Sequence, residues 1–244
     1  MTLSLGTGLG LTAQPSTVAP FSPGDLTLAA WYDPSDLSTL WQDAAGTTPV
    51  TSDSDPVGRI DDKSGNGRHA TQGTAGSRPL YHVSGGVHWL EFDGTDDGLQ
   101  AAFSISQPFE RISAIRQLSW TAGDQVYGGV TANAGTLYQV NVSPQLVFFD
   151  GTFAVYNSDA DMDEDAIVTE LHDGASSTST INRGTPATGD PGTDAPGGIT
   201  IGNNFIASGA ADMRFYGLVM AATLSGAERV LLEDWLAAKA GISL

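Results

Sequence analysis

The sequence contains no cysteine among its 244 residues. This absence excludes disulfide bonds, metal sites built from thiolates and a cysteine nucleophile, and it leaves the redox compartment undetermined. A chain of this length can bury a core that is large enough to be stable without such cross-links. We therefore expect one large domain that is stabilised by packing, a size that is usual for all-β sandwiches.

Basic residues are scarce. Ten Lys and Arg stand against 28 Asp and Glu, which gives a formal net charge of −18. We expect no nucleic acid partner, because binding to phosphates requires a basic surface. The acidic excess fits three interpretations, which are solubility, cation binding and attraction to a basic partner surface.

Long hydrophobic runs are also missing. No stretch approaches the roughly 20 apolar residues of a membrane-spanning helix. Residues 1–11 lack the basic region and the unbroken apolar stretch of a signal peptide. We expect no membrane association, and a protein that is made in the cytoplasm and stays soluble unless it leaves within a larger particle.

The first 25 residues differ from the rest of the chain. They alternate leucine with small residues, pass through three prolines and carry almost no charge. Such a segment cannot form its own core, so we predict an extended N-terminal arm over residues 1–25. Two interpretations stay open, a disordered tail or a strand that is added to the sheet edge of a neighbouring protein. The residues expected to anchor this arm are Leu3, Leu5, Leu9, Leu11 and Phe21.

Residues 26–244 read as a single β domain. Short runs of β-forming residues follow one another at short intervals, separated by Gly, Asn, Asp or Pro. This pattern predicts an all-β fold, a two-sheet antiparallel jelly-roll sandwich. Two stretches with turns rich in Asp, Gly and Asn, at residues 61–70 and 89–99, are expected to be its corners. In the first cluster, Asn66-Gly67 predicts a tight hairpin turn.

One strong helix signal occurs near the end of the chain. Ser225 and Glu228 have the spacing of a capping box, and Gly241 marks a helix end. We predict a C-terminal helix over residues 226–240 that buries Trp235 at one edge of the domain. The apolar residues at helical spacing are Leu231, Leu232, Trp235, Leu236 and Ala238.

Four motifs in this order resemble the concanavalin A-like lectin and laminin G-like superfamily. They are the loop at residues 62–70, the strand and Asp-Gly turn at 89–99, the Asp-Gly and Asn-Arg-Gly turns at 172–184, and Leu224-Ser225-Gly226-Ala227-Glu228. The string at residues 30–50 is similar to a narrower group, laminin G-like proteins encoded by tailed bacteriophages and prophages. The resemblance covers about residues 27–240.

The resemblance implies a structural protein of a tailed bacteriophage virion. Such a protein would be made in the cytoplasm of the bacterial host and displayed on the virion as a head decoration or a tail or fibre component. Its arm would bind other virion proteins of the capsid or tail, and a homo-oligomer is expected. The alternative is an adhesin module that binds polysaccharide on the host surface. No cofactor is required in either case, and Ca²⁺ is the one ion that the resemblance suggests.

Two groups of aspartates are the candidate Ca²⁺ ligands that the resemblance suggests at the rim of the sandwich. The first is Asp93, Asp96 and Asp97, which also fit simple turn capping. The second is Asp159, Asp161 and Asp163, which with Glu170 follow the ligand count of an EF-hand loop. Glu164 stands where that loop needs glycine, and no helix follows, so a solvated acidic loop is the alternative.

Catalysis finds little support in the sequence. Glucanases of the superfamily use paired carboxylates at period two, and Glu91-Phe92-Asp93 is the nearest approach. The four histidines show no metal-ligand spacing, and no serine lies in a nucleophile elbow. We therefore predict no catalytic residues and no enzymatic activity.

A sugar-binding site needs an aromatic platform beside polar groups. Four aromatic residues could supply one, but Trp and Tyr in a sandwich are more often core residues with a polar tip at the edge. Sequence alone does not choose between these two roles. The four candidates are Trp41, Trp120, Tyr127 and Tyr138.

Overall fold

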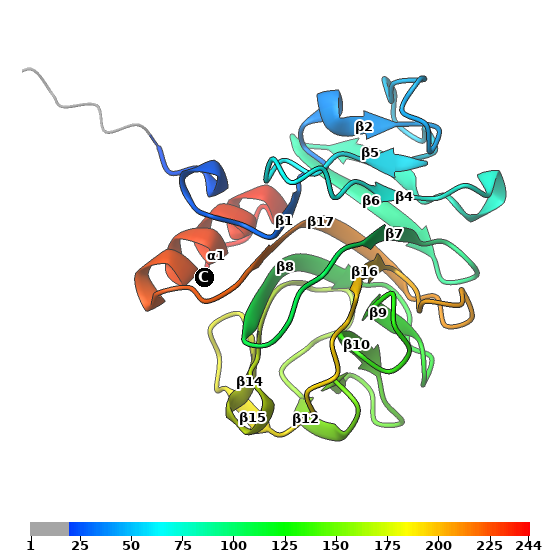
Figure 1. The fold of residues 1–244 in the computed structure, drawn as a ribbon. Helices are drawn as coiled ribbons and strands as arrows, with labels where there is room; N and C mark the ends of the chain where they lie inside the picture. Colours follow the sequence, from blue (N-terminus) through cyan, green and yellow to red (C-terminus); the bar gives the residue numbers. More distant parts are fainter. Residues whose placement is uncertain (1–19) are drawn as a thin grey trace, which may run out of the picture.

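The computed structural model describes residues 20–244. In this part of the chain the strands form two sheets (Figure 1). One sheet has eight strands in the order β15-β14-β13-β8-β17-β6-β5, and β1 also pairs with β17. Its strands are β1 (Ala30–Tyr32), β5 (Leu80–Ser84), β6 (Val87–Asp93), β8 (Phe109–Gln117), β13 (Asp165–His172), β14 (Ser177–Ile181), β15 (Ala187–Gly189) and β17 (Asp212–Ala221).

The other sheet has nine strands in the order β12-β11-β10-β9-β16-β7-β4-β3-β2. Every pairing between named strands in the two sheets is antiparallel. The strands of this second sheet are β2 (Leu40–Trp41), β3 (Arg59–Ile60), β4 (Ala70–Thr71), β7 (Leu99–Ala102), β9 (Gln125–Gly128), β10 (Thr136–Gln139), β11 (Leu146–Phe149), β12 (Phe153–Asn157) and β16 (Gly198–Ile201).

Helical structure is limited to one α-helix and four short 3-10 turns within residues 20–244. Over that range, no helix is both long and apolar enough to cross a membrane. The helical elements are α1 (Gly226–Ala240), η1 (Pro23–Asp25), η2 (Leu37–Thr39), η3 (Ala75–Ser77) and η4 (Gly174–Ser176).

Strand β8 shows why the sheets pack face to face. Side chains alternate along a strand, so its odd and even residues lie on opposite faces. Phe109 and Ile115 belong to the main core, which also holds Leu137 of the second sheet. Ile112 and Ala114 belong to a separate cluster on the other face, beneath α1. The predicted two-sheet antiparallel sandwich is therefore confirmed.

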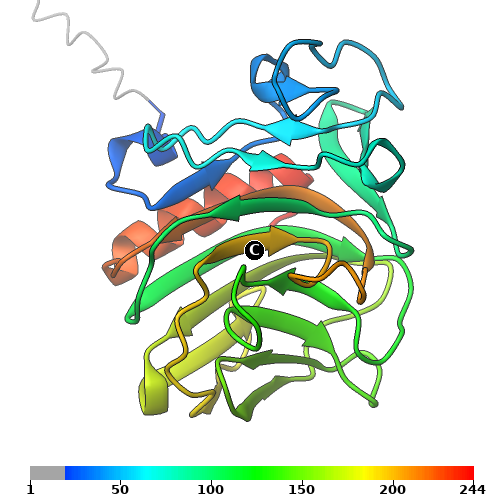
Figure 2. The same cartoon turned by 45° about the vertical axis from the view of Figure 1, so that its right-hand side comes forward.

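The predicted C-terminal helix is present, with its predicted ends. The Ser225 side chain accepts the backbone N–H of Glu228 at 3.3 Å, and the Glu228 carboxylate accepts the backbone N–H of Ser225 at 2.8 Å. Gly241 ends the helix with a φ of 75°. Helix α1 lies along the outer face of the eight-stranded sheet, over β8 and β17 (Figure 2).

The face of α1 that packs on the sheet differs in part from the prediction. Leu232 and Leu236 are fully buried, at the spacing of four that places them on one side of the helix. Leu231 falls beside this stripe and is 42% exposed. Trp235 is only half-buried and meets Trp31 edge to face, with ring centroids 5.7 Å apart. The helix thus lies flat on the sheet instead of closing one edge through Trp235.

The Asp-rich loop between β3 and β4 binds strand β1 through Asp62. It is not the tight hairpin turn that we predicted. Gly65 and Gly67 have positive φ angles, but Asn66 does not, whereas a type I′ turn needs both central residues there. The loop closes around a buried carboxylate instead. Asp62 accepts hydrogen bonds at 2.9–3.0 Å from three backbone N–H groups, those of Trp31, Ser64 and Arg68.

The predicted N-terminal arm falls largely outside the described residues. Leu3, Leu5, Leu9 and Leu11 lie there, so their anchoring role stays a prediction. Phe21 lies inside, and its half-buried ring packs against the cluster beneath α1. The described end of the predicted arm is therefore in contact with the domain.

Four charged or titratable side chains lie buried between the sheets, and we call them the inter-sheet charge network: Arg111 of β8, Asp150, and Glu170 and His172 of β13. Each has a side chain that is at most 1% exposed. Arg111 donates from two nitrogens to the two oxygens of Glu170, at 2.7 and 2.8 Å. His172 Nδ1 lies 2.6 Å from Asp150 Oδ2 and donates to it, because an ionised carboxylate only accepts.

This network links one sheet to the other through Gly135, which directly precedes β10. Arg111 donates to the Gly135 carbonyl at 2.8 Å, and Asp150 accepts the Gly135 N–H at 2.5 Å. Asp150 itself directly follows β11, and His172 stacks on Phe109 with ring centroids 4.1 Å apart. Strands β8 and β13 of one sheet therefore hold the start of β10 and the end of β11 in the other.

We expect Glu170→Gln to lower the free energy of unfolding by about 3 to 5 kcal/mol, because it leaves the Arg111 charge buried without a counter-charge. Urea denaturation measures the loss. The matched control is Glu91→Gln, which makes the same chemical change in the partly exposed pair with Arg214 and should cost less than about 1 kcal/mol. Equal losses in the two variants would contradict a role for burial.

Candidate functional site

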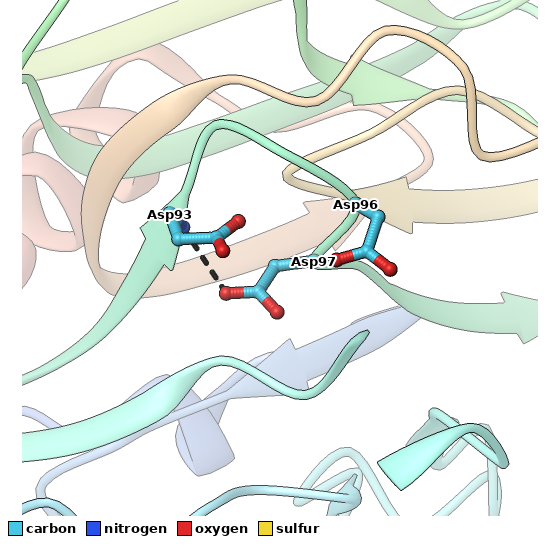
Figure 3. Close-up of side chains that lie close together, drawn as sticks. All are labelled: Asp93, Asp96 and Asp97. Carbon is cyan, nitrogen blue, oxygen red and sulfur yellow. Dashed lines mark hydrogen bonds between the residues drawn. The ribbon is translucent and has the colours of Figure 1, made fainter. Parts of the chain in front are cut away.

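Three carboxylates gather at the turn that follows β6 (Figure 3). The strand ends at Asp93, and Gly94 turns the chain with a φ of 68°. A Cβ atom on Gly94 would lie 2.7 Å from Cβ of Asp212, so the turn needs glycine here. One oxygen from each of Asp93, Asp96 and Asp97 lies within 4.8 Å of the others. The structure therefore brings the first group of predicted Ca²⁺ ligands together.

Hydrogen bonds within the turn account for the positions of these carboxylates. Asp97 accepts the backbone N–H of Asp93 at 3.1 Å, and Asp93 accepts that of Thr95 at 2.8 Å. The Ser77 hydroxyl donates to Asp96 at 2.7 Å. Aspartates make such contacts in turns without a metal. A Ca²⁺ site at this turn thus stays a prediction.

Asp97 is the buried member of the group, with 4% of its surface exposed. Burial, with repulsion from Asp93 and Asp96, raises the pKa of the Asp97 carboxyl to about 6. Beside it lies a cavity of about 330 Å³, which is also lined by Glu91 and Asp212. The charged lining of this cavity thus consists of four carboxylates and one cation, Arg78. A further cation there would offset the repulsion that remains among the carboxylates.

The second group of predicted Ca²⁺ ligands does not form such a cluster within the described residues. Asp159, Asp161 and Asp163 are all exposed. Glu170, the last residue of the EF-hand-like count, lies on β13 and points into the core, where it binds Arg111. The spacing of these acidic residues resembles that of an EF-hand loop, but Glu170 lies on strand β13 and not in the loop.

An aromatic groove lies on the outer face of the nine-stranded sheet. The strand register places Tyr138 of β10 opposite Val147 of β11, and Val147 opposite Tyr156 of β12. The three side chains thus form one row across three strands. Tyr156 is 44% exposed, whereas Val147 between the two tyrosines is fully buried. Tyr138 and Tyr156 both line this groove, although they come from different strands.

The hairpin that joins β10 to β11 completes this groove with amide groups. Asn141 and Gln145 line it, and Gln145 donates to the Ser158 hydroxyl at 2.9 Å. Val142 lines it too and is 62% exposed. The groove has a volume of about 560 Å³, and we call it the tyrosine groove. Its lining residues are Ala122, Gly123, Tyr138, Gln139, Val140, Asn141, Val142, Gln145 and Tyr156.

The tyrosine groove carries no formal charge at neutral pH. Its nine lining residues include no acidic or basic side chain other than the tyrosine phenols. Burial and the neighbouring Tyr156 raise the pKa of the Tyr138 phenol to about 12. Phenols and amides both donate and accept hydrogen bonds. The groove therefore offers apolar rings and neutral polar groups together.

Only one of the four aromatic candidates from the sequence lies in this groove. Tyr138 does, but Trp41 donates to Asp61 at 2.8 Å and Trp120 to the Val140 carbonyl at 2.8 Å. Tyr127 is fully buried in the core. Tyr156 was not predicted, because its place beside Tyr138 depends on the register of three strands.

The comparisons with known proteins identify the fold and no family. No protein-family model matches the sequence, and no curated protein matches it. Trypanosoma rangeli sialidase in complex with sialic acid has a TM-score of 0.55 and 10% identity, over 89% of this chain and 34% of that chain. An arabinofuranosidase complexed with arabinofuranosyl-alpha-1,2-xylobiose has a TM-score of 0.52 and 16% identity, over 75% of this chain and 51% of that chain.

The receptor binding domain of botulinum neurotoxin type G also shares the fold, with a TM-score of 0.52 and 10% identity, over 75% of this chain and 51% of that chain. This chain thus corresponds to about a third to a half of the length of these proteins. At such low identity the likeness shows the fold alone. It does not test the expected relation to phage proteins.

These neighbours contradict the prediction that the chain is not an enzyme. That prediction depended on the incomplete carboxylate motif at Glu91 and Asp93. Two of the three structures are a sialidase and an arabinofuranosidase, so this fold occurs in glycosidases. Glu91 and Asp93 also lie on one cavity with Asp97 and Asp212, which the sequence did not indicate.

We expect Asp97→Asn to stabilise the protein at pH 7 and not at pH 4. The raised pKa means that ionisation of Asp97 opposes folding, a cost that is small near pH 4 and grows as the pH rises to about 6. Relief of this cost should add roughly 1 to 3 kcal/mol to the free energy of unfolding at pH 7. Urea denaturation at the two pH values tests this, and a loss of stability at pH 7 would refute it.

Calcium should stabilise the protein through the first group of aspartates, if the predicted site exists. For an affinity typical of extracellular modules, 10 mM Ca²⁺ should add roughly 1.5 to 2.5 kcal/mol to the free energy of unfolding. Asp96→Asn should abolish this gain, whereas Asp161→Asn should retain it. Thermal unfolding with Ca²⁺ and with EDTA measures the effect, and identical curves for the wild type would remove Ca²⁺ from both groups.

Proposed function

We propose that this chain is a carbohydrate-binding module whose ligand lies in the tyrosine groove. The observation that carries the proposal is the row of Tyr138, Val147 and Tyr156, which places two tyrosines on the same face of the sheet, one on each side of Val147. Aromatic side chains offer a large, rigid contact surface with a polar tip. The apolar C–H face of a sugar ring can lie against such a surface.

The amides of the adjacent hairpin supply the second requirement of a sugar site. Sugar hydroxyls both donate and accept hydrogen bonds, and so do the side chains of Asn141 and Gln145. A site that combines apolar walls with a few polar groups is typical of small-molecule binding. The groove, at about 560 Å³, is large enough for a ligand of one to a few sugar rings.

The proteins with the same fold support this proposal only at the level of the fold. Two of them are described as complexes with sugars, sialic acid in one and arabinofuranosyl-xylobiose in the other. This chain shares 10% and 16% identity with them, so neither ligand is carried over. The sandwich is thus a scaffold that can present a sugar site, and the groove is where this chain has the chemistry for one.

Display on a phage virion stays a separate prediction. The anchoring leucines of the arm lie outside the described residues, and no comparison concerns the virion, its proteins or a homo-oligomer. A glycan-binding module would be useful on a virion surface, so the two interpretations are compatible. Incorporation of the chain into particles, with and without residues 1–19, would test the virion role.

A glycan array tests the proposed site. The wild type should bind at least one glycan, and Tyr156→Ala should weaken that binding roughly tenfold, because a lost ring contact is worth on the order of 1 kcal/mol. Tyr138→Ala should do the same, whereas Tyr138→Phe retains the ring and should bind more tightly than Tyr138→Ala. Affinities come from calorimetry on the glycans that the array identifies.

The matched control for Tyr156→Ala is Phe205→Ala. Phe205 is exposed to a similar degree, 41% against 44% for Tyr156, and it does not line the tyrosine groove. Binding by Phe205→Ala should equal that of the wild type. No binding to any glycan by the wild type, or equal binding by Tyr156→Ala, would overturn the proposal.

A further inference from the structure

We infer that the tyrosine groove selects uncharged glycans and excludes those that carry carboxylate, sulfate or phosphate. This inference depends on the proposed function and adds the chemical class of the ligand. It stems from how the whole chain uses its few cations. All ten Lys and Arg lie within the described residues, so each one can be assigned a partner.

Eight of the ten cations form ion pairs with carboxylates of the same chain. Their side chains are at most 33% exposed. Several pairs use two nitrogens of one guanidinium, as Arg116 does with Asp165 at 2.6 and 2.8 Å. The eight are Arg59, Lys63, Arg111, Arg116, Arg183, Arg214, Arg229 and Lys239.

The other two cations are held by backbone carbonyl groups. Arg68 donates to the Ala29 carbonyl at 2.8 Å and lies over the ring of Phe103. Arg78 donates to the Gln42 carbonyl at 2.9 Å and to two further carbonyls at longer distances. Both side chains thus hold loops to the sheets, and neither lines the tyrosine groove.

An anionic sugar would need a cationic partner, and every Lys and Arg of this chain already has a partner within the protein. Carboxylate, sulfate and phosphate groups are recognised chiefly by charge-assisted hydrogen bonds from Arg or Lys. To supply one, the chain would have to break one of its eight ion pairs or release Arg68 or Arg78 from the backbone carbonyls that they bind. The net charge of −18 also repels polyanions at long range.

Binding of a neutral sugar requires no free cation and involves no repulsion from the net charge of the protein. Its ring packs on Tyr138 and Tyr156, and its hydroxyls meet the amides of Asn141 and Gln145, which donate and accept equally well. No charge on the protein or the ligand loses its hydration. Binding should therefore depend little on salt, since no ion pair forms across the interface.

The test compares matched neutral and charged glycans at 50 and 500 mM NaCl. Suitable pairs are dextran with dextran sulfate, and cello-oligosaccharides with their carboxymethyl derivatives, added to an array that holds both classes. We expect binding to neutral glycans only, with a dissociation constant that changes less than twofold between the two salt concentrations.

A new cation in the groove should broaden the ligand class. Val142→Lys places one there, and it should bind charged derivatives of the neutral ligand at 50 mM NaCl and lose them at 500 mM. Ile206→Lys is the matched control, because Ile206 is 63% exposed against 62% for Val142 and lies outside the groove. It should behave as the wild type.

The outcomes separate this inference from the proposed function. Wild-type binding to anionic glycans, with weakening by Tyr156→Ala, would overturn the neutral selectivity and leave the proposed site in place. Binding to no glycan of either class would overturn both. Binding to neutral glycans alone, with the gain in Val142→Lys and not in Ile206→Lys, supports both.

Discussion

The buried pairing of Arg111 with Glu170 and of His172 with Asp150 is the constraint on which both the sandwich and its groove depend. Charges that are buried must be paired and hydrogen-bonded, so the two sheets have one relative position that satisfies all four side chains. The backbone of Gly135 is held from both sides by this network. Strand β10 begins at the next residue and carries Tyr138. The position of the groove is thus linked to the charges in the core.

The charge balance of the chain has a structural explanation. Its ten cations stabilise the fold. They form ion pairs with carboxylates on strands, loops and α1, or donate hydrogen bonds to backbone carbonyls. Asp33, for example, accepts from both Lys63 and Lys239 and so joins the end of β1 to a loop and to the helix. The acidic excess stays at corners and on the surface. The tyrosine groove, by contrast, is lined by neutral residues, and this is the basis of the proposal that it binds an uncharged ligand.

The acidic corners show how one residue type can have different roles. Asp62 is buried and binds three backbone N–H groups, so its loop is explained by structure alone. Asp97 is also buried, but its carboxylate accepts the backbone N–H of Asp93 and lies beside other carboxylates on a cavity. Its pKa rises to about 6 for that reason. A buried carboxylate of this kind lowers the free energy of unfolding unless a bound cation offsets its charge. A catalytic role would be another reason to retain it, and this fold does occur in glycosidases.

The sequence by itself determined the class of fold, because the alternation of strand residues, the Gly and Asn turns and the Ser225 capping box are local signals. It also brought Asp93, Asp96 and Asp97 together, since they lie within five consecutive residues of one turn. Only the tertiary structure decided that Arg111 and Glu170 point inward, because a charged residue on a strand is otherwise expected to face water. Only the register of β10, β11 and β12 placed Tyr156 beside Tyr138. A site built across strands depends on long-range pairing, which spacing along one chain does not encode.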